Sequence, residues 1–267
     1  MRVENAPTNI VRKLDESAVL VSGGTSGIGL ASAIRFAESG VKRIAIMGRN
    51  SERGDAARKR VLECAPKAQV EYICADAGNA TSAEEAVAKA HKLMGGLDVL
   101  VNSTHGSNPA QPLYKIPVAD ISRLITQTVL APFHMGRCVL PYMQEQRGGA
   151  IINVASDSAK TATPGGTILG AGMAAIVMYS RTLAMEAKRF GIRVNVVTPA
   201  LVTDTPLYDL AMADQFTARV FAEAARKSAL GFSTPRDVAA LIVFLASPDA
   251  ARLTGQAISV NGGMSAA

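Results

Sequence analysis

The sequence contains no tryptophan, and aromatic residues make up only 4% of its 267 residues. Proteins that bind single-stranded nucleic acid without sequence preference stack bases on aromatic side chains, so this scarcity argues against such a role. Cysteine is also rare, because Cys64, Cys74 and Cys138 are the only three and form no C-x-x-C pair. We therefore expect neither a disulfide framework nor a zinc site, and we predict no metal ligands.

Long apolar runs are missing as well. No stretch reaches the roughly 18 apolar residues that a membrane-spanning helix needs. Residues 1–17 are polar and mix basic with acidic side chains, so they lack the apolar segment of a signal peptide. These absences predict a protein with no membrane partner, and a cytoplasmic location follows by default.

Charge of one sign is not concentrated anywhere in the chain. The formal net charge is +6, which would suit nucleic acid or a membrane surface if the basic residues were clustered. They are spread out instead, and the densest stretch, residues 49–60, also holds Glu52 and Asp55. We expect a small-molecule partner that carries phosphate, and no nucleic-acid partner.

The alternation of segments predicts an α/β protein. Hydrophobic residues make up 48% of the chain and charged residues 19%, which is enough apolar material for a full core. Short β-branched runs alternate with longer helical stretches, a pattern typical of βαβ units. The expected strands are near residues 18–22, 43–47, 69–74, 97–102, 150–155, 193–197 and 257–260. The expected helices are near residues 27–39, 51–63, 82–94, 118–146, 170–190, 212–228 and 235–246.

This order predicts one doubly wound domain over residues 17–267, preceded by an N-terminal extension at residues 1–16. Its centre would be a seven-stranded parallel sheet with helices on both faces, because parallel strands need crossover connections. The last expected helix has a clear start signal, in which the Thr234 hydroxyl caps the helix and Pro235 occupies its first turn.

A glycine-rich loop follows the first expected strand. It reads Ser-Gly-Gly-Thr-Ser-Gly-Ile-Gly over residues 22–29, so Gly23, Gly27 and Gly29 stand where a strand turns into a helix. Glycine allows a positive φ in the turn and lets backbone N–H groups approach a pyrophosphate, which the helix N-terminus also favours. In this strand–turn–helix setting the loop predicts a dinucleotide site in a Rossmann fold, whereas the glycines alone would indicate only a tight turn.

The end of the second expected strand bears on the choice of cofactor. A site specific for NAD usually has an acid here that binds the ribose 2′-hydroxyl, but this chain has Gly48 followed by Arg49. An arginine suits a 2′-phosphate through its charge and its forked pair of donors. We therefore predict NADP(H) in preference to NAD(H), although a solvated arginine at a helix start would look the same in the sequence.

These motifs resemble the short-chain dehydrogenase/reductase family, and the resemblance covers nearly the whole chain. The glycine loop is similar to the family's TGxxxGIG pattern, with Ser22 in place of Thr. Asp76 stands where the family has an acid on the adenine side, and Asn102 begins a segment, Asn-Ser-Thr-His, that keeps only the first residue of Asn-Asn-Ala-Gly. Residues 195–199 resemble the family's Asn-x-x-x-Pro-Gly segment, with Ala200 for Gly.

The resemblance implies a set of cofactor contacts from the glycine loop and from the segments after the second, third, fourth and sixth strands. These expected contacts are Gly23, Thr25, Ser26, Gly27, Ile28, Gly29, Arg49, Asn50, Asp76, Ala77, Asn102, Pro199 and Val202. It also implies a homo-oligomer, a tetramer or dimer, formed through the apolar helix expected at residues 170–190.

The catalytic stretch departs from the family pattern. In the family a serine ends the fifth strand, a tyrosine follows 13 residues later, and a lysine stands four residues beyond the tyrosine. Ser156 fits the serine place, but the same spacing leads to Leu169 and Met173 without any gap, and the supporting asparagine of the fourth helix becomes Thr128. The resemblance therefore implies an atypical active site in which Ser156 alone remains.

Other side chains could take part in the chemistry. His105 occupies the glycine place of the family's Asn-Asn-Ala-Gly motif, and its ordinary pKa range suits proton transfer, so we include it as a candidate catalytic residue. Asp157 and Lys160 lie in the loop after Ser156, and Tyr208 lies in the loop before the helix expected at 212–228. The remaining candidates, Tyr179, His91 and His134, are expected to be structural residues within helices.

Three functions remain open from the sequence. The first is an NADP(H)-dependent oxidoreductase acting on a small hydrophobic carbonyl, hydroxyl or activated C=C substrate, as the apolar Leu169, Leu201, Val202 and Leu207 near the expected pocket suggest. The second is a catalytically degenerate binding or partner subunit. The third is a cofactor-independent lyase or isomerase that uses His105 or Asp157 as a base.

Overall fold

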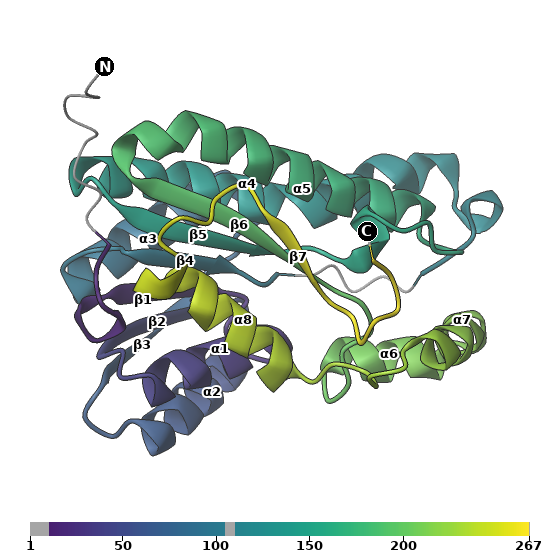
Figure 1. Ribbon diagram of the computed structural model, residues 1–267, viewed down its shortest axis with the longest axis horizontal. Coiled ribbons are helices and arrows are strands. Elements are labelled where there is room, and N and C mark those ends of the chain that lie inside the picture. Colours follow the sequence, from purple (N-terminus) through teal and green to yellow (C-terminus); the bar gives the residue numbers. More distant parts are fainter. Residues whose placement is uncertain (1–10, 105–109, 267) are drawn as a thin grey trace.

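Seven parallel strands form the centre of the structure, a computed structural model that describes residues 11–104 and 110–266 (Figure 1). The strands lie side by side in the order β3-β2-β1-β4-β5-β6-β7. Their bounds are β1 (Ala18–Ser22), β2 (Arg43–Gly48), β3 (Gln69–Cys74), β4 (Val99–Asn102), β5 (Gly149–Val154), β6 (Ile192–Pro199) and β7 (Ala257–Val260). The order reverses between β1 and β4, so the carboxyl ends of these two strands form the crevice where doubly wound sheets bind ligands.

Helices cover both faces of the sheet, as the sequence predicts (Figure 1). One face packs against α1 (Gly27–Glu38), α2 (Ser51–Cys64) and α8 (Pro235–Ala246). The other packs against α3 (Ala80–Met94), α4 (Ile121–Glu145) and α5 (Thr167–Ala187). Short 3₁₀ turns add η1 (Leu14–Glu16), η2 (Leu113–Lys115), η3 (Val118–Asp120), η4 (Asp157–Ala159), η5 (Lys188–Phe190) and η6 (Pro248–Ala250). The doubly wound fold class is confirmed.

The central strands are largely apolar because both faces of the sheet are buried. Every residue of β1 and β6 is buried, and alternate side chains of β6 enter the two opposite cores. Val194 packs towards α5, whereas Val197 packs towards α8. This double coverage explains why the strands read as continuous apolar runs rather than as alternating polar and apolar residues.

The segment after β6 differs from the expected single helix at residues 212–228. It forms two helices, α6 (Pro206–Ala213) and α7 (Gln215–Lys227), with Asp214 between them. Thr205 caps α6 by accepting from the Tyr208 N–H, and Asp214 caps α7 by accepting from the Thr217 N–H. Tyr208 therefore lies on α6 and not in a loop.

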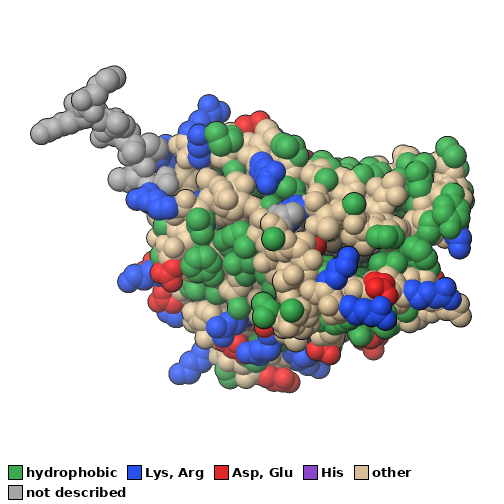
Figure 2. Space-filling model, turned by 45° about the vertical axis from the view of Figure 1, so that its right-hand side comes forward, with side chains coloured by type: hydrophobic (Ala, Val, Ile, Leu, Met, Phe, Trp, Pro, Cys, Tyr) green, Lys and Arg blue, Asp and Glu red, His purple; other side chains and the backbone are tan. Residues whose placement is uncertain are grey.

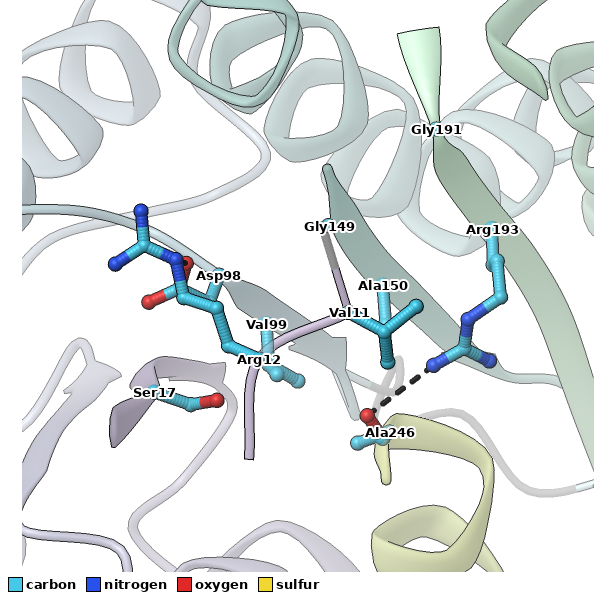
Figure 3. Close-up of a pocket in the computed structure, with 10 residues that line it drawn as sticks. All are labelled: Val11, Arg12, Ser17, Asp98, Val99, Gly149, Ala150, Gly191, Arg193 and Ala246. Atoms are coloured by element: carbon cyan, nitrogen blue, oxygen red, sulfur yellow. Dashed lines mark hydrogen bonds and ion pairs between the residues drawn. The ribbon is translucent and has the colours of Figure 1, made fainter. Parts of the chain in front are cut away.

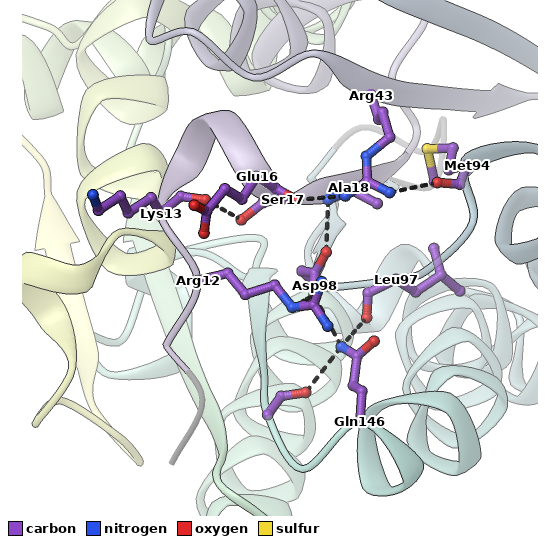
Figure 4. Close-up of polar contacts among 11 residues, drawn as sticks. Arg12, Lys13, Glu16, Ser17, Ala18, Arg43, Met94, Leu97, Asp98 and Gln146 are labelled. Atoms are coloured by element: carbon purple, nitrogen blue, oxygen red, sulfur yellow. Dashed lines mark hydrogen bonds and ion pairs between the residues drawn. The ribbon is translucent and has the colours of Figure 1, made fainter. Parts of the chain in front are cut away.

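The amino ends of the strands are closed by a polar network around Asp98 (Figure 4). This buried carboxylate accepts from the Ala18 N–H at 2.8 Å, from Gln146 at 3.1 Å and from the Arg12 guanidinium at 3.0 Å. Arg43 donates to the carbonyl of Met94 nearby. The network attaches the segment before β1 to the amino end of the sheet, whereas the crevice lies at the carboxyl end.

Arg193 closes the same end of the sheet beneath α8 (Figure 3). Its guanidinium is buried and donates to the carbonyls of Leu245, Ala246, Ser247 and Ala250, where α8 ends. Burial lowers the pKa of Arg193 to about 10, so the group stays charged at neutral pH. The small cavity beside it measures about 20 Å³, which is far too small for a nucleotide.

We expect Arg193→Met to destabilise the protein by more than about 3 kcal/mol, because each buried carbonyl left without a donor costs about 1–3 kcal/mol. The free energy of unfolding, measured in urea, checks this. Arg193→Lys should recover only part of the loss, since one ammonium cannot reproduce the guanidinium fork. A methionine variant as stable as the native protein would contradict the role given to these bonds.

Among the residues that the structure describes, one helical segment, Thr167–Phe190, is long and apolar enough by length and composition to cross a membrane. In the structure it is α5 with the following turn, and one face of it packs against β6 and α4 (Figure 1). A core helix passes the same test, so this segment is weak support for a membrane span.

On one face of the molecule, charged side chains of both signs lie at the surface. On the face shown in Figure 2, Lys and Arg side chains are scattered and alternate with Asp and Glu. The net charge of +6 is therefore not gathered into a basic patch on that face.

Candidate functional site

The glycine loop lies at the crevice between β1 and β4. Ser22, the last residue of β1, is the register partner of Asn102, the last residue of β4, so the loop begins where the strand order reverses. The N–H groups of Gly23 and Gly24 both donate to the carbonyl of Met47 in β2, which fixes the start of the loop against the sheet.

Two of the loop glycines are required by close backbone contacts. Gly23 has φ +77°, and a Cβ there would lie 2.4 Å from the carbonyl oxygen of Ser103. A Cβ at Gly29 would lie 2.1 Å from the carbonyl oxygen of Gly23. Gly27, with φ +49°, faces the methyl group of Thr205, so α6 lies close to the loop. The turn is therefore as tight as the pyrophosphate motif requires.

The first turn of α1 is open to an anion. Its N-cap residue, Ser26, makes no side-chain capping bond within the described residues, whereas Asn50 caps α2 and Asn79 caps α3. The first N–H groups of a helix have no partner inside the helix, and they favour negative charge. The residues present thus fit a phosphate group at this position.

Buried polar atoms point to the same crevice. Among the described residues, Ser22 Oγ and Asn102 Oδ1 are buried without a hydrogen-bond partner. The amide of Asn102 donates to Asn153 at 2.8 Å, and Asn153 donates to Ser180 of α5 at 2.8 Å. This chain of side chains fixes β4, β5 and α5 relative to one another and leaves one acceptor at the crevice unsatisfied.

The end of β2 has no space for an acid. A Cβ at Gly48 would lie 2.7 Å from the Thr25 methyl group, so an aspartate there would force Thr25 to move. Arg49 follows with a side chain that is 74% exposed, and its guanidinium lies 4.0 Å from Asp76. A pair as exposed as this is weak, so Arg49 can turn towards a ligand.

The other predicted cofactor residues surround this crevice or support its edges. Asp76 is exposed after β3 and accepts from the Gly78 N–H, while Ala77 is buried and its carbonyl contacts His134 Nδ1. Pro199 is the last residue of β6, and Val202 lies just beyond it in a β-bridge with Ser233. Loop residue Ile28 is partly buried at the start of α1, beside Thr25 and Ser26.

Ser156 follows β5 and is half-buried, at the position expected for a catalytic serine. Its Oγ accepts from the Ser158 N–H at 3.2 Å and from the Ser158 hydroxyl at 3.0 Å. Because both acceptor positions are used, the Ser156 proton is directed away from Ser158 and can be donated to a ligand. Ser158 was not predicted, although the Ser-Asp-Ser spacing was visible in the sequence.

An apolar cluster includes Met173 and borders Leu169, the two residues at which the resemblance expects the family's tyrosine and lysine to be replaced. Met173 is only 3% exposed and packs with Ala155, Ile176 and Val177, and Leu169 contacts the edge of the same cluster. Neither side chain can transfer a proton. Thr128 does not replace the supporting asparagine either, because its hydroxyl donates to Leu124 within α4.

Two charged candidates after Ser156 are held by the C-terminal segment. Asp157 is buried and accepts from Asn261 at 3.0 Å and from the Ser265 hydroxyl at 2.8 Å. Lys160 donates to Ser259 of β7 at 2.6 Å. These contacts give Asp157 and Lys160 structural roles in closing the carboxyl end of the sheet.

The other aromatic and histidine candidates that the structure describes pack within the protein. Tyr179 stacks on Phe133 of α4, and burial raises its pKa to about 12. His91 stacks on Tyr142, and His134 contacts the Ala77 carbonyl, so both lie in helix packing as expected. His105 lies outside the described residues. Within the described ranges, no group of three or more His, Cys, Asp or Glu residues could hold a metal ion.

Known proteins resemble this chain over almost its full length. A family model described as enoyl-(acyl carrier protein) reductase matches residues 23–265. The 7alpha-hydroxysteroid dehydrogenase of Bacteroides fragilis is 30% identical over 257 residues, covering 95% of this chain and 96% of the relative. Levodione reductase of Leifsonia aquatica is 28% identical over 276 residues and is covered completely.

Solved structures agree with these sequence matches. The crystal structure of levodione reductase superposes with a TM-score of 0.88 at 27% identity, covering 94% of this chain and 98% of that one. A 7 alpha-hydroxysteroid dehydrogenase complexed with NADH and 7-oxo glycochenodeoxycholic acid has a TM-score of 0.85 at 25% identity, with 94% and 95% covered. The sheet order and both helical layers are therefore shared with dehydrogenases and reductases.

Proposed function

This chain belongs to the short-chain dehydrogenase/reductase family and is an oxidoreductase of that type, and we propose that it uses NADP(H) in an atypical active site. One observation carries the cofactor assignment: the tight glycine loop opens onto α1 at the β1–β4 crevice, with Arg49 at the end of β2. When bound, the nicotinamide would supply or accept hydride. Residues 17–267 would act as one cytoplasmic domain.

The predicted contact residues would each hold a different part of the cofactor. The α1 N-terminus, with Ser26, Gly27 and Ile28, would bind the pyrophosphate. Arg49 and Asn50 would bind the 2′-phosphate side, and Asp76 and Ala77 would line the adenine. Asn102, Pro199 and Val202 would face the nicotinamide half.

The proposed chemistry rests on Ser156. Hydride addition to a carbonyl, or to the far carbon of an enone, builds negative charge on the substrate oxygen. Ser156 would donate its proton as a hydrogen bond to that oxygen, since Ser158 already satisfies its acceptor side. Water would then protonate the alkoxide or the enolate carbon. The apolar cluster at Leu169 and Met173 favours a small hydrophobic substrate.

The direct test has two parts. The first part is a titration in which NADPH binding is monitored by the change in NADPH fluorescence. We expect the dissociation constant for NADPH to be lower than that for NADH. Oxidation of the bound NADPH should then be followed with a panel of ketones, aldehydes and enones. Absence of binding of both NADPH and NADH would exclude the redox function and leave the lyase, isomerase or binding-protein function.

A second candidate function is favoured by the burial of Met173. Met173 is 3% exposed within an apolar cluster, which supports the proposal that core packing has taken the place of the proton-transfer groups. This favours a catalytically degenerate subunit that binds the cofactor within a larger assembly. NADPH binding without turnover on any member of the panel would support it over the first.

Arg49→Asp is expected to weaken NADPH binding at least about tenfold while sparing NADH, because a charge-assisted contact contributes about 1.5–3 kcal/mol. Fluorescence titrations with both cofactors measure the ratio. Arg226→Asp is the matched control, because Arg226 on α7 is likewise an exposed arginine, 76% exposed, in a weak ion pair with an acid. Equal affinity of the native protein for both cofactors would refute the assignment.

We also propose a homodimer or homotetramer formed through α5. Its outer face presents a stripe of small and apolar residues in which Met178 is 59% exposed and Met185 is 62% exposed. Such a stripe along a long helix fits an interface between copies. Sedimentation at micromolar concentration would refute this proposal if it gave a monomer.

A further inference from the structure

Side chains of β3 reach across to the carboxyl end of β2, directly beneath Arg49. Tyr72 donates its hydroxyl to the carbonyl of Gly48 at 2.9 Å. Its ring lies flat on α2 at Gly54, where a Cβ would come within 2.2 Å of the ring carbons. Gly54 is therefore the residue that lets Tyr72 occupy the space between β3 and α2.

The next carbonyl along the chain is held in the same way. Cys74, the register partner of Gly48, directs its thiol to the carbonyl of Arg49 at 3.8 Å. Ser51, the first residue of α2, donates its hydroxyl to Cys74 Sγ at 3.5 Å. Asn50 then caps α2 by accepting from the Arg53 N–H at 2.8 Å.

Two consecutive backbone carbonyls, those of Gly48 and Arg49, are thus fixed by β3 while the Arg49 side chain stays 74% exposed. From this arrangement we infer that Tyr72 and Cys74 are positioning residues that hold Arg49 for a 2′-phosphate. The inference rests on the proposed NADP(H) function and deepens it, because it says why a single exposed arginine can select the cofactor.

The physical reason is the entropy of a long side chain. An arginine on a mobile turn loses backbone and side-chain freedom when it binds, and that loss reduces affinity. A turn fixed in advance leaves only the side chain to be ordered. NADH has a hydroxyl in place of the 2′-phosphate, so its binding should not depend on where Arg49 stands.

Tyr72→Phe removes the hydroxyl and keeps the ring on Gly54, so the fold should be retained. We expect NADPH affinity to fall about three- to tenfold, the worth of one hydrogen bond, while NADH affinity stays unchanged. Cys74→Ala should act in the same direction, and Cys74→Ser should restore affinity because it retains a donor. Cys64→Ala, at another exposed cysteine, is the matched control.

A double-mutant cycle separates positioning from a general structural effect. In the Arg49→Asp background, Tyr72→Phe should no longer change NADPH affinity, because the residue it positions is gone. If Tyr72→Phe weakens NADPH and NADH equally, or weakens NADPH as much without Arg49, the inference is overturned. Melting temperatures of all variants show whether a loss of affinity reflects unfolding.

Thiol labelling gives an independent readout. The hydrogen bond from Ser51 lowers the pKa of the Cys74 thiol, which favours its reaction with a maleimide. Adenosine 2′,5′-bisphosphate should protect Cys74 and leave Cys64 reactive. A native protein that does not prefer NADPH overturns the proposed cofactor and this inference together. A native preference that persists in the Tyr72 and Cys74 variants overturns this inference alone.

Discussion

Replacing Leu169 with tyrosine and Met173 with lysine together is expected to raise carbonyl reduction by about 10²–10⁴-fold, the usual worth of general acid catalysis. Leu169 and Met173 lie one turn apart near the start of α5, after the same loop as Ser156. A tyrosine at 169 would supply the proton that Ser156 alone provides poorly. The rate of NADPH oxidation with a ketone panel measures the gain.

Neither single substitution should suffice. A tyrosine without a nearby cation keeps a pKa near 10 and stays a weak acid at neutral pH. A lysine at 173 without the tyrosine places an ammonium in an apolar cluster with Ile176 and Val177, where burial lowers its pKa and disfavours its charge. The double variant should therefore be more active but less stable than the native protein.

The control for this experiment is Leu169→Phe with Met173→Lys, which keeps an aromatic ring and removes only the hydroxyl. It should show no gain. If the native protein already reduces a ketone at a typical enzymatic rate of about 10 s⁻¹, an unrecognised donor is present and the apolar cluster is not the limiting feature.

The fold could be predicted because its signals are local and repeated. The bounds expected for the strands near residues 69–74 and 257–260 are those of β3 and β7. The fourth strand begins two residues later than expected, at Val99, although the Asp98 N–H still donates to the Ala18 carbonyl and the Asp98 carbonyl accepts from the Ala150 N–H.

The division of α6 from α7 could have been found. The pair Thr205-Pro206 carries the same start signal as Thr234-Pro235, which does predict α8. The signal at 205 is followed by a helix of only eight residues, too short for an apolar period to be evident. Asp214 then caps a second helix, α7. The structure therefore has two helices where the sequence predicts a single one at residues 212–228.

Only those parts of the candidate site that come from short stretches of sequence could be predicted. Glycine spacing and Arg49 are local, so the loop and the end of β2 lie together as expected. The support behind them is not local: Tyr72 reaches Gly48 across 24 positions, and Lys160 reaches Ser259 across 99. Contacts of that kind depend on the register of β2 with β3 and of β6 with β7, which composition and spacing do not specify.

Ser156→Ala is expected to remove most of any residual turnover, with a loss of about 10²–10³ in kcat, the cost of deleting one oxyanion donor. The loss should appear in kcat and not in cofactor affinity, because Ser156 lies after β5 and the phosphates are expected at α1. Steady-state kinetics and NADPH titrations, made on the same preparation, measure the two quantities separately.

Ser158→Ala is the informative companion variant. It deletes the hydroxyl that donates to Ser156 Oγ at 3.0 Å but leaves the Ser158 N–H bond at 3.2 Å, so Ser156 keeps one of its two donors. Turnover should fall less than in Ser156→Ala, because the catalytic hydroxyl remains and only its orientation is less fixed. If Ser156→Ala retains most of the turnover, the proton donor lies elsewhere, and His105 and Tyr208 become the residues to replace.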